Sequence, residues 1–373
     1  MLNVYLLNVS FDVAGAERRF VNIWNGLRRR GNVRPILVLP QCLAQKLKAS
    51  GELPGGGDSD VWEVPEFSIS SCFGPPFGMI RTRLLALRFK PFYRLIQNDP
   101  NCVVHFGLPS GPVVTPDLPT VYECVDSTLK GFKSSHYRRA TRRCCIIHCQ
   151  TNRIAEALKC AWQKEQPLWK LAVNPCCFAQ YSTELQPLAR DSHLILFAGR
   201  LSNEKSPLLF LQALHLLKER GAAFRAIILG KGPLYNSVKI FIRDHNLGNI
   251  VEVKHSYDIK DQMQSASIFV SLQTGDNYPS QSLLEAMGAG CAVVATDVGE
   301  TWRIVDDQVG CRVPLNAAAV ANAIERLLNN PAMTIGLGTQ ARNRVLQDFT
   351  LDRYLDYVEN LYHDAITIHN SRL

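Results

Sequence analysis

Residues 193–205 read HLILFAGRLSNEK, and the rest of the chain repeats the pattern that this stretch introduces. Residues 193–198 form a short, mostly apolar run, which is typical of a strand buried in a sheet. The run ends in Gly199, and a basic loop follows it. Residues 207–218 then show helical periodicity and end before Gly221. A buried strand followed by a helix is the unit from which parallel sheets are built.

The same strand–helix unit recurs along the second half of the chain. We expect further strands at 224–229, 250–253, 268–272, 292–296 and 310–313, separated by helices such as 279–287, 317–328 and 333–348. The first half shows a weaker version, with strands expected at 4–9, 35–39, 103–106, 120–124 and 145–148, a helix at 16–29, and a long loop at 50–78. The pattern predicts an α/β protein with parallel sheets covered on both faces.

The chain is too long for one hydrophobic core. It has 373 residues, and single cores stop growing near about 250–300 residues. We therefore expect two Rossmann-like domains, at 1–180 and 193–350, joined by a linker at 181–192. Residues 351–373 form a final helix and tail, with apolar residues on one helical face.

Composition restricts the class of protein. Apolar residues make up 46% of the chain and charged residues 20%, as in ordinary globular domains. No stretch reaches the roughly 18 uncharged apolar residues of a membrane span, and the N-terminus lacks the features of a signal peptide. The 12 cysteines contain no C-x-x-C pair, so we expect reduced, buried thiols and a cytoplasmic location.

Positive charge is concentrated in the first half. Residues 1–190 contain 24 Lys and Arg against 14 Asp and Glu, whereas residues 191–373 contain 17 against 19. Residues 79–95, MIRTRLLALRFKPFYRL, interleave cations with apolar side chains, although Pro91 should limit any helix to the part before it. Arg138, Arg139, Arg142 and Arg143 form a second patch. A solvated face is the ordinary explanation, but the charge balance favours a phosphate-bearing acceptor or the inner face of an anionic membrane as partner, and no nucleic acid.

Two loops of the second half have the composition of an anion site. Arg200 and Lys205 follow a strand, and ligands of such sheets bind outside the carboxyl ends of strands. These cations would stabilise a leaving diphosphate, or they are merely solvated. The segment LGKGPL at 229–234 places Gly230, Gly232 and Pro233 after the next strand. Its glycines allow a flat ligand to approach the backbone, or they form a plain tight turn.

A third segment, 276–287, reads DNYPSQSLLEAM and opens a helix. The free N–H groups of Ser280, Gln281 and Ser282 would form an anion site at the helix N-terminus. Glu285 follows in that helix and could accept the hydroxyls of a ribose, while Asp276 could accept those of a sugar. A lone helical Glu is usually a solvated charge, but apolar neighbours on both sides of Glu285 indicate a buried helix.

These motifs together resemble the family 4 glycosyltransferases of the GT-B fold. The order is G-R-x4-K, then L-G-x-G-P-L, then Y-P-S-Q-S-L-L-E-A-M-G-A-G, and the resemblance covers residues 193–365. Residues 14–18, AGAER, are similar to the G-G-A-E-R loop of that family. The resemblance implies two domains that face each other across a cleft, with a C-terminal helix that crosses back to the first domain.

The same resemblance implies an activity. It implies a retaining, metal-independent transfer of a hexose-type unit from a nucleotide diphosphate sugar to a glycan or lipid-linked acceptor, in cell-surface polysaccharide synthesis and without a cofactor. Arg200 and Lys205 would bind the diphosphate, Asp276 the donor sugar, and Gly15 would leave room for the phosphates. The expected donor-binding set is Gly15, Arg200, Lys205, Gly230, Gly232, Pro233, Ser280, Gln281, Ser282 and Glu285.

Two departures from the family pattern stand out. The family usually has Glu-x7-Glu, but here Asn277 lies eight residues before Glu285, and the nearest carboxylate is Asp276. The first-domain histidine expected near the reaction centre is missing from 119–126. His105 is the substitute that we include with Arg200, Lys205 and Asp276 as catalytic, and Glu123 and Asp126 are the others. A packed histidine is the ordinary alternative for His105.

Other motifs and other functions are weaker explanations. The D-x-D motif of Asp58 and Asp60 follows three glycines and indicates a loop rather than a metal site. The cluster of Cys144, Cys145, His148 and Cys149 lacks zinc-ligand spacing, so no metal is expected. The rival function is a catalytically idle relative that binds a nucleotide sugar or glycan. A nucleotide-sugar epimerase is a third, disfavoured by residues 276–290.

Overall fold

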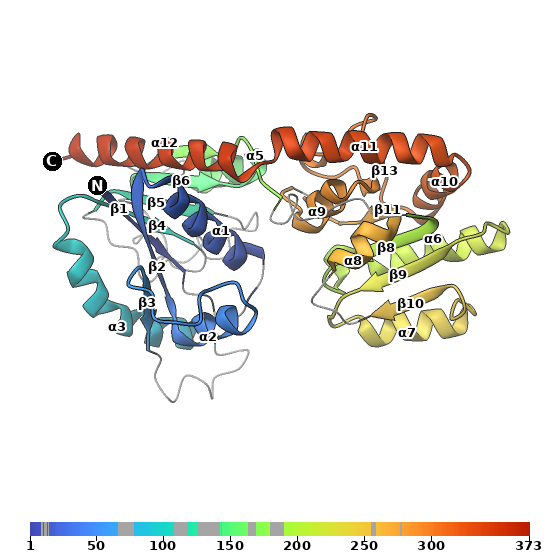
Figure 1. Ribbon diagram of the computed structural model, residues 1–373, viewed down its shortest axis with the longest axis horizontal. Helices are drawn as coiled ribbons and strands as arrows, with labels where there is room; N and C mark the ends of the chain where they lie inside the picture. The colour runs from blue at the N-terminus through green and yellow to red at the C-terminus, as the bar shows by residue number, and fades with distance from the viewer. Residues whose placement is uncertain are drawn as a thin grey trace. The chain divides into compact units, whose positions relative to one another are not determined.

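The computed structural model contains two α/β units, and each is described by itself (Figure 1). Unit 1 consists of Met1–Pro175 together with Leu351–Leu373, and unit 2 of Cys176–Thr350. The structure describes residues 1–8, 10, 13, 15–65, 78–107, 118–124, 142, 144–162, 169–179, 190–254, 259–276 and 278–373.

Unit 1 is built on a seven-stranded sheet in the order β3-β2-β1-β4-β5-β6-β7, whose neighbouring strands all pair in parallel. One face packs on α3 and α5, and α1 and α12 contact strands of the same sheet. Its elements are β1 (Leu2–Leu7), α1 (Gly15–Arg30), β2 (Val33–Pro40), α2 (Gln41–Ala49), β3 (Val61–Val64), α3 (Gly78–Gln97), β4 (Cys102–Phe106), β5 (Thr120–Cys124), β6 (Ile146–Cys149), α5 (Asn152–Ala161), β7 (Lys170–Val173) and α12 (Leu351–Asn370).

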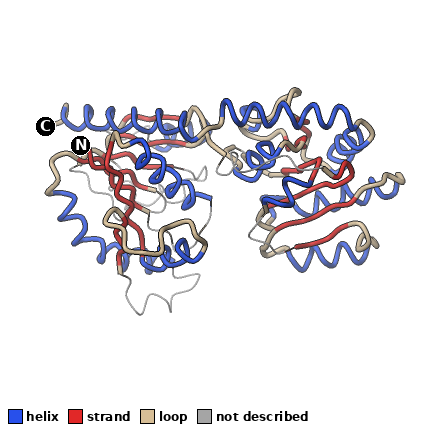
Figure 2. Tube along the Cα trace, viewed as in Figure 1, coloured by secondary structure: helices blue, strands red, loops and turns tan. Residues whose placement is uncertain are grey.

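Unit 2 has a six-stranded parallel sheet in the order β10-β9-β8-β11-β12-β13. Separate apolar clusters cover its two faces, and Figure 2 shows helices on both sides of the strands. Its elements are β8 (Asp191–Ala198), η3 (Asn203–Lys205), α6 (Pro207–Glu219), β9 (Arg225–Leu229), α7 (Tyr235–Asp244), β10 (Val251–Lys254), α8 (Lys260–Ser265), β11 (Ala266–Ser271), α9 (Gln281–Ala289), β12 (Ala292–Thr296), η4 (Thr301–Arg303), β13 (Gly310–Val313), α10 (Ala317–Leu328) and α11 (Pro331–Asp348).

The expected class of two Rossmann-like domains is therefore confirmed, with two local corrections. Part of the loop expected at 50–78 is a strand, β3, which pairs in parallel with β2. Helix α3 also continues through Pro91. It continues because Phe89, Tyr93 and Ile96 bury its inner face, while Pro91 lies on the exposed face, where water can satisfy the carbonyl left without a donor.

Candidate active site

Three loops meet at the carboxyl edge of the unit 2 sheet, after β8, β9 and β11. The N–H of Leu201 donates to the carbonyl of Lys231 at 2.8 Å, and the N–H of Thr274 donates to that of Glu204 at 3.0 Å. These backbone bonds hold the Gly199–Lys205 loop between the other two loops. The three segments that the sequence singled out are thus brought together at one edge.

Gly230 and Gly232 have a specific packing role in this arrangement. A Cβ added to Gly230 would lie 1.9 Å from the Gly199 carbonyl oxygen, and one added to Gly232 would lie 2.3 Å from that of Leu201. Both distances are far below van der Waals contact, so only glycine fits. On the side where a Cβ would project, the glycines contact a neighbouring loop rather than a ligand. Their contact with a ligand on the other side stays a prediction, as does that of the exposed Pro233.

The two expected phosphate-binding cations differ in their surroundings. Arg200 is exposed at the end of the β8 strand, whereas Lys205 is half-buried in η3. Burial lowers the pKa of Lys205, and the nearby Glu204 carboxylate only partly opposes that shift. A partly desolvated ammonium gains more from an incoming anion than a fully hydrated one does. The geometry therefore suits Lys205 better than Arg200 for a strong contact with phosphate.

One carboxylate oxygen of Asp276 is already bonded within the protein. Its Oδ1 accepts the N–H of Glu300 at 2.9 Å and that of Tyr278 at 3.2 Å, which ties the loop after β11 to the loop after β12. Gly299 allows this approach, because a Cβ there would lie 2.5 Å from the Asp276 carboxyl carbon. The other oxygen, Oδ2, is buried and has no partner among the described residues. One carboxylate oxygen is thus left for a hydroxyl donor.

Helix α9 begins beside Asp276. Ser280 is its N-cap but makes no capping bond with its side chain, and the first-turn N–H groups lie at the positive end of the helix dipole. The side-chain amide nitrogen of Gln281 donates to the Phe178 carbonyl at 3.1 Å, so this nitrogen already has a partner within the protein. Ser282 is half-buried at the same end. Glu285 is only 6% exposed, as its apolar neighbours predicted.

Buried polar atoms without partners gather around this edge. Among the described residues they include Ser202 Oγ, Asp276 Oδ2, Ser280 Oγ and Gln281 Oε1. Buried polar groups in folded proteins are nearly always hydrogen-bonded, so a group of exceptions at one place calls for a polar partner. A hydroxyl-rich ligand with an anionic group would supply both donors and charge to this edge.

The expectation for His105 in unit 1 is corrected by its burial. The histidine is 0% exposed, so it cannot touch a substrate as we expected of a catalytic residue. Its Nδ1 lies 3.0 Å from the Tyr362 hydroxyl, and its Nε2 lies 3.6 Å from Glu123 Oε1. Glu123 is buried too, and its other oxygen accepts from Arg19. Gly15 is the exposed first residue of α1, and Asp126 lies outside the described residues.

His148 completes this buried group, with Nδ1 3.7 Å from Glu123 Oε1. Burial would raise the pKa of Glu123, but Arg19 and the two histidines hold it well below its usual range. Burial also lowers the pKa of His148. The ionised pair of Arg19 and Glu123 is therefore already neutral overall. A divalent cation among His105, Glu123 and His148 would add two uncompensated charges to the core, and we assign no metal to the group.

The weaker sequence motifs also have structural explanations. Asp58 pairs with Arg28, and Asp60 pairs with Arg34 at 2.8 Å, so both carboxylates of the D-x-D motif are neutralised by arginine. Cys144, Cys145 and Cys149 are buried thiols. Of the second basic patch, only Arg142 belongs to the described residues.

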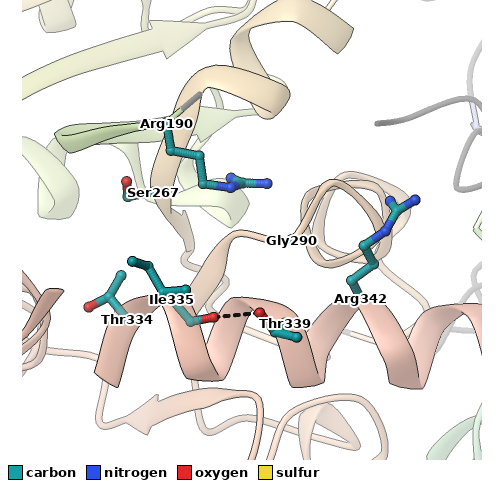
Figure 3. Close-up of a pocket in the computed structure, with 7 residues that line it drawn as sticks. All are labelled: Arg190, Ser267, Gly290, Thr334, Ile335, Thr339 and Arg342. Carbon is teal, nitrogen blue, oxygen red and sulfur yellow. Dashed lines mark hydrogen bonds between the residues drawn. The ribbon is translucent and has the colours of Figure 1, made fainter. Parts of the chain in front are cut away.

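A pocket of about 230 Å³ lies at the opposite edge of the unit 2 sheet, near the amino ends of β8 and β11 (Figure 3). Its polar side chains already bind backbone carbonyls. Arg190 donates to the carbonyls of Ala266 and Ala289, and Arg342 to that of Gly288. Both arginines therefore bind carbonyls at the C-terminal end of α9, where a positive charge interacts favourably with the helix dipole. The pocket therefore lacks the partnerless polar groups of the opposite edge.

This chain is similar to known glycosyltransferases. Residues 192–330 match the family model of the glycosyl transferases group 1. The putative colanic acid biosynthesis glycosyltransferase WcaL of Escherichia coli is 32% identical over 33% of this chain and 33% of its own length. A UDP-Gal:alpha-D-GlcNAc-diphosphoundecaprenol alpha-1,3-galactosyltransferase of the same species is 24% identical over 48% and 47%. The matched part is less than half of each relative.

Solved structures extend the likeness to both units. Anabaena HepE in complex with UDP and glucose has a TM-score of 0.72 at 17% identity and covers 96% of this chain and 99% of its own. WaaG, a glycosyltransferase involved in lipopolysaccharide biosynthesis, has a TM-score of 0.67 at 16% identity over 95% and 99%. At such identities the likeness establishes the fold alone, which is the GT-B fold that the motifs predicted.

Proposed function

Because residues 192–330 match the family model of the glycosyl transferases group 1, we propose that the chain is a retaining glycosyltransferase. It would transfer a hexose-type unit from a nucleotide diphosphate sugar to a glycan or lipid-linked acceptor in cell-surface polysaccharide synthesis. The names of the relatives support this proposal, since they include colanic acid, amylovoran and capsular polysaccharide enzymes.

The single observation that carries the proposal is the group of buried, partnerless polar atoms at the carboxyl edge of unit 2. Asp276 Oδ2 and Ser280 Oγ belong to it, and Lys205 lies on a loop bonded to theirs. Hydroxyls of a sugar and its ribose would satisfy these atoms, and a diphosphate would neutralise the half-buried ammonium. The solved neighbours with UDP, or with UDP and a sugar, support the same class of ligand.

In this proposal the chain's own cations stabilise the leaving group. Cleavage of the bond between sugar and diphosphate leaves negative charge on the phosphate oxygens. Lys205, Arg200 and the first-turn N–H groups of α9 would stabilise that charge, so the step requires no metal ion. Asp276 would orient the sugar through its hydroxyls, and Glu285 would hold the ribose, which fixes the reacting carbon relative to the acceptor.

The acceptor side of the proposal rests on unit 1. Leu87, Arg88, Pro91, Arg94 and Leu95 are exposed at positions i, i+1, i+4, i+7 and i+8, which lie on one face of α3. Cations beside exposed leucines suit an anionic lipid surface. No helix within the described residues is long and apolar enough to cross a bilayer. We therefore propose that this face of α3 binds the membrane surface that carries the lipid-linked acceptor. The side chains of Arg81, Arg83 and Lys90 lie outside the described part of the chain.

One observation favours a second candidate, a catalytically idle protein that binds nucleotide sugars. His105, the expected substitute for the first-domain histidine of the family, is fully buried, with Nδ1 3.0 Å from the Tyr362 hydroxyl and Nε2 3.6 Å from Glu123 Oε1. Hydrolysis of the donor separates the two functions. An enzyme releases some nucleotide diphosphate even without acceptor, whereas a binding protein releases none.

The proposal is tested first by a thermal-shift screen against nucleotide diphosphates and their sugars. A ligand at 100 times its Kd stabilises the native state by about 2.7 kcal/mol. We expect a rise in Tm with one nucleotide, its loss in Glu285→Gln, and its persistence in Glu219→Gln, where the exposed glutamate lies at the end of α6. A shift that survives Glu285→Gln would remove the proposed ribose contact, and no shift with any nucleotide would contradict both functions.

A further inference from the structure

Three buried polar side chains of unit 1 lie near the carboxyl ends of neighbouring strands, with Glu123 opposite His148 and His105 two residues lower in the register. His105, Glu123 and His148 are the penultimate residues of β4, β5 and β6, and the strands are neighbours in parallel register. The three side chains therefore point to one face, directly beneath the carboxyl edge. Ligands of α/β sheets bind at that edge. A group in this position can hold the binding loops in place without touching a ligand.

The first turn of α1 is anchored from two sides at this edge. Arg19 donates to the buried Glu123 on β5, and Arg18 Nε lies 3.1 Å from both oxygens of Glu52, which follows α2. Two successive arginines thus tie one helical turn to two different elements. Gly15, where α1 begins, is the predicted donor contact on the preceding loop. The anchors fix where that loop ends.

Helix α12 closes the group from the other side. The pKa of Tyr362 is raised well above its usual value by burial, so its hydroxyl stays protonated and can donate to His105 Nδ1 at 3.0 Å. The other ring nitrogen of His105, Nε2, lies 3.6 Å from Glu123 Oε1. Tyr362 thus holds the His105 ring beside Glu123, where Arg19 and the two histidines favour the ionised carboxylate, and the ionised carboxylate is the form that holds Arg19.

We propose that Glu123 is a positioning residue for the reaction, holding the first turn of α1 through Arg19 with the support of His105 and Tyr362. The inference rests on the proposed function, in which unit 1 contributes the Gly15 loop and the acceptor surface. Glu123 itself touches no substrate, since it is 1% exposed. Its contribution therefore appears mainly in turnover, because unit 2 supplies all the expected donor contacts except Gly15.

The test replaces the ion pair by apolar residues of similar volume, as Arg19→Met with Glu123→Leu. Such replacements of a buried pair are often neutral or stabilising, so the variant should fold with an unchanged or higher Tm. We expect the Kd for nucleotide to stay within about twofold of the parent. We expect kcat to fall by about 10- to 100-fold, since a misplacement of about 1 Å costs on the order of 100-fold.

A stable double variant with parental kcat would overturn the inference while leaving the proposed function intact. A parent protein that neither binds nucleotide nor transfers sugar would instead refute the proposed function. If the double variant does not fold, Tyr362→Phe tests the inference instead, because it removes one hydroxyl and keeps the ring. Its kcat should fall at unchanged nucleotide Kd, with a lower Tm because the buried His105 Nδ1 loses its partner, and a parental kcat would again overturn the inference.

Discussion

Lys205 is the residue whose removal should cost the most activity. It is a half-buried cation in the loop after β8, and burial already lowers its pKa. An anionic donor would offset the desolvation of this ammonium and be stabilised in return. We expect Lys205→Ala to lower kcat/KM by about 10²- to 10³-fold, the usual loss of one electrostatic contact to a leaving group. Steady-state transfer assays would measure it.

The matched control is Lys239→Ala, an exposed lysine on α7 of the same unit. It should leave kcat/KM unchanged within twofold or so, because an exposed, screened cation contributes little. Equal losses in both variants would mean that overall charge, and no specific phosphate contact, governs the reaction.

Gly232 should be indispensable for the folding of unit 2. A Cβ at this position would lie 2.3 Å from the Leu201 carbonyl oxygen, with backbone on both sides of the contact. Strain and overpacking of this kind cost about 1–3 kcal/mol each. We expect Gly232→Ala to lower the free energy of unfolding of unit 2 by at least that amount in urea denaturation. Gly199→Ala should be near-neutral, since a Cβ there meets no described atom within 4 Å.

Single residues were predictable from sequence to different degrees. The burial of Glu285 followed from its apolar neighbours, and the sequence placed Lys205 and Asp276 after strands, as observed. The bonds of Asp276 to the loop after β12 were not predictable, because they join residues 24 positions apart. The role of His105 was missed for the same reason. Its partner Tyr362 lies 257 residues away, and no local pattern records that contact.

Helix α12 owes its place on unit 1 to α1. Gly26 lies against it so closely that a Cβ would approach Leu355 Cδ1 to 2.5 Å, and Arg30 binds Asp356 at 2.7 Å. We expect Gly26→Leu to displace α12, because overpacking of a tight contact costs about 1–3 kcal/mol. Hydrogen exchange of residues 351–370 should accelerate. Asn25→Leu adds the same side chain on the exposed face, and faster exchange there would contradict a packing cause.

Helix α3 offers a separate test of the membrane proposal. Its exposed face carries Arg94 between Pro91 and Leu95, so the protein should co-sediment with vesicles that contain anionic lipid. Each basic residue near such a surface contributes about 1 kcal/mol. Arg94→Glu should therefore weaken binding more than Arg243→Glu, an exposed site on α7 of unit 2. If the protein bound neutral vesicles as strongly as anionic ones, an electrostatic contribution to membrane binding would be excluded.

Elements with a clear period were easier to predict than those set by their neighbours. The strands β8, β11 and β12 stand out as apolar runs, because both of their faces are buried. Strand β3 has only four residues and lies at the edge of its sheet, so its sequence carries a weak signal. The passage of α3 through Pro91 depended on the core beneath it, which sequence periodicity alone did not reveal.

The two-unit division followed from length and from the repeated strand–helix pattern, but its exact boundary did not. We expected a linker at 181–192, whereas contacts place the division between Pro175 and Cys176. Residues 176–179 belong to unit 2 because Ala179 donates its N–H to the Phe349 carbonyl at 3.0 Å, and Gln281 binds Phe178. Such long-range bonds decide to which unit a connecting segment belongs, and the composition of the segment does not encode them.

The two units should respond differently to acid. Burial lowers the pKa of His148 in unit 1 below its usual value near 6.5, so the unfolded chain binds more protons than the folded one as pH falls below about 6.5. Stability from the neutral histidine is therefore present above that pH and is lost below it. The loss is up to about 1.4 kcal/mol for each pH unit. Glu123, whose pKa is also lowered, adds a loss of the same sign only below about pH 4.5.

Calorimetry between pH 8 and 5 should therefore show the unit 1 transition falling by about 2–4 °C for each kcal/mol lost, with little change in the unit 2 transition. His148→Gln keeps a polar side chain of similar size but cannot titrate, so it should remove most of the difference between the two units. An equal fall of both transitions, or a His148→Gln protein as acid-sensitive as the parent, would show that the buried histidine does not set the acid response. Either result would also weaken the case that the charges beneath the unit 1 edge form one linked group.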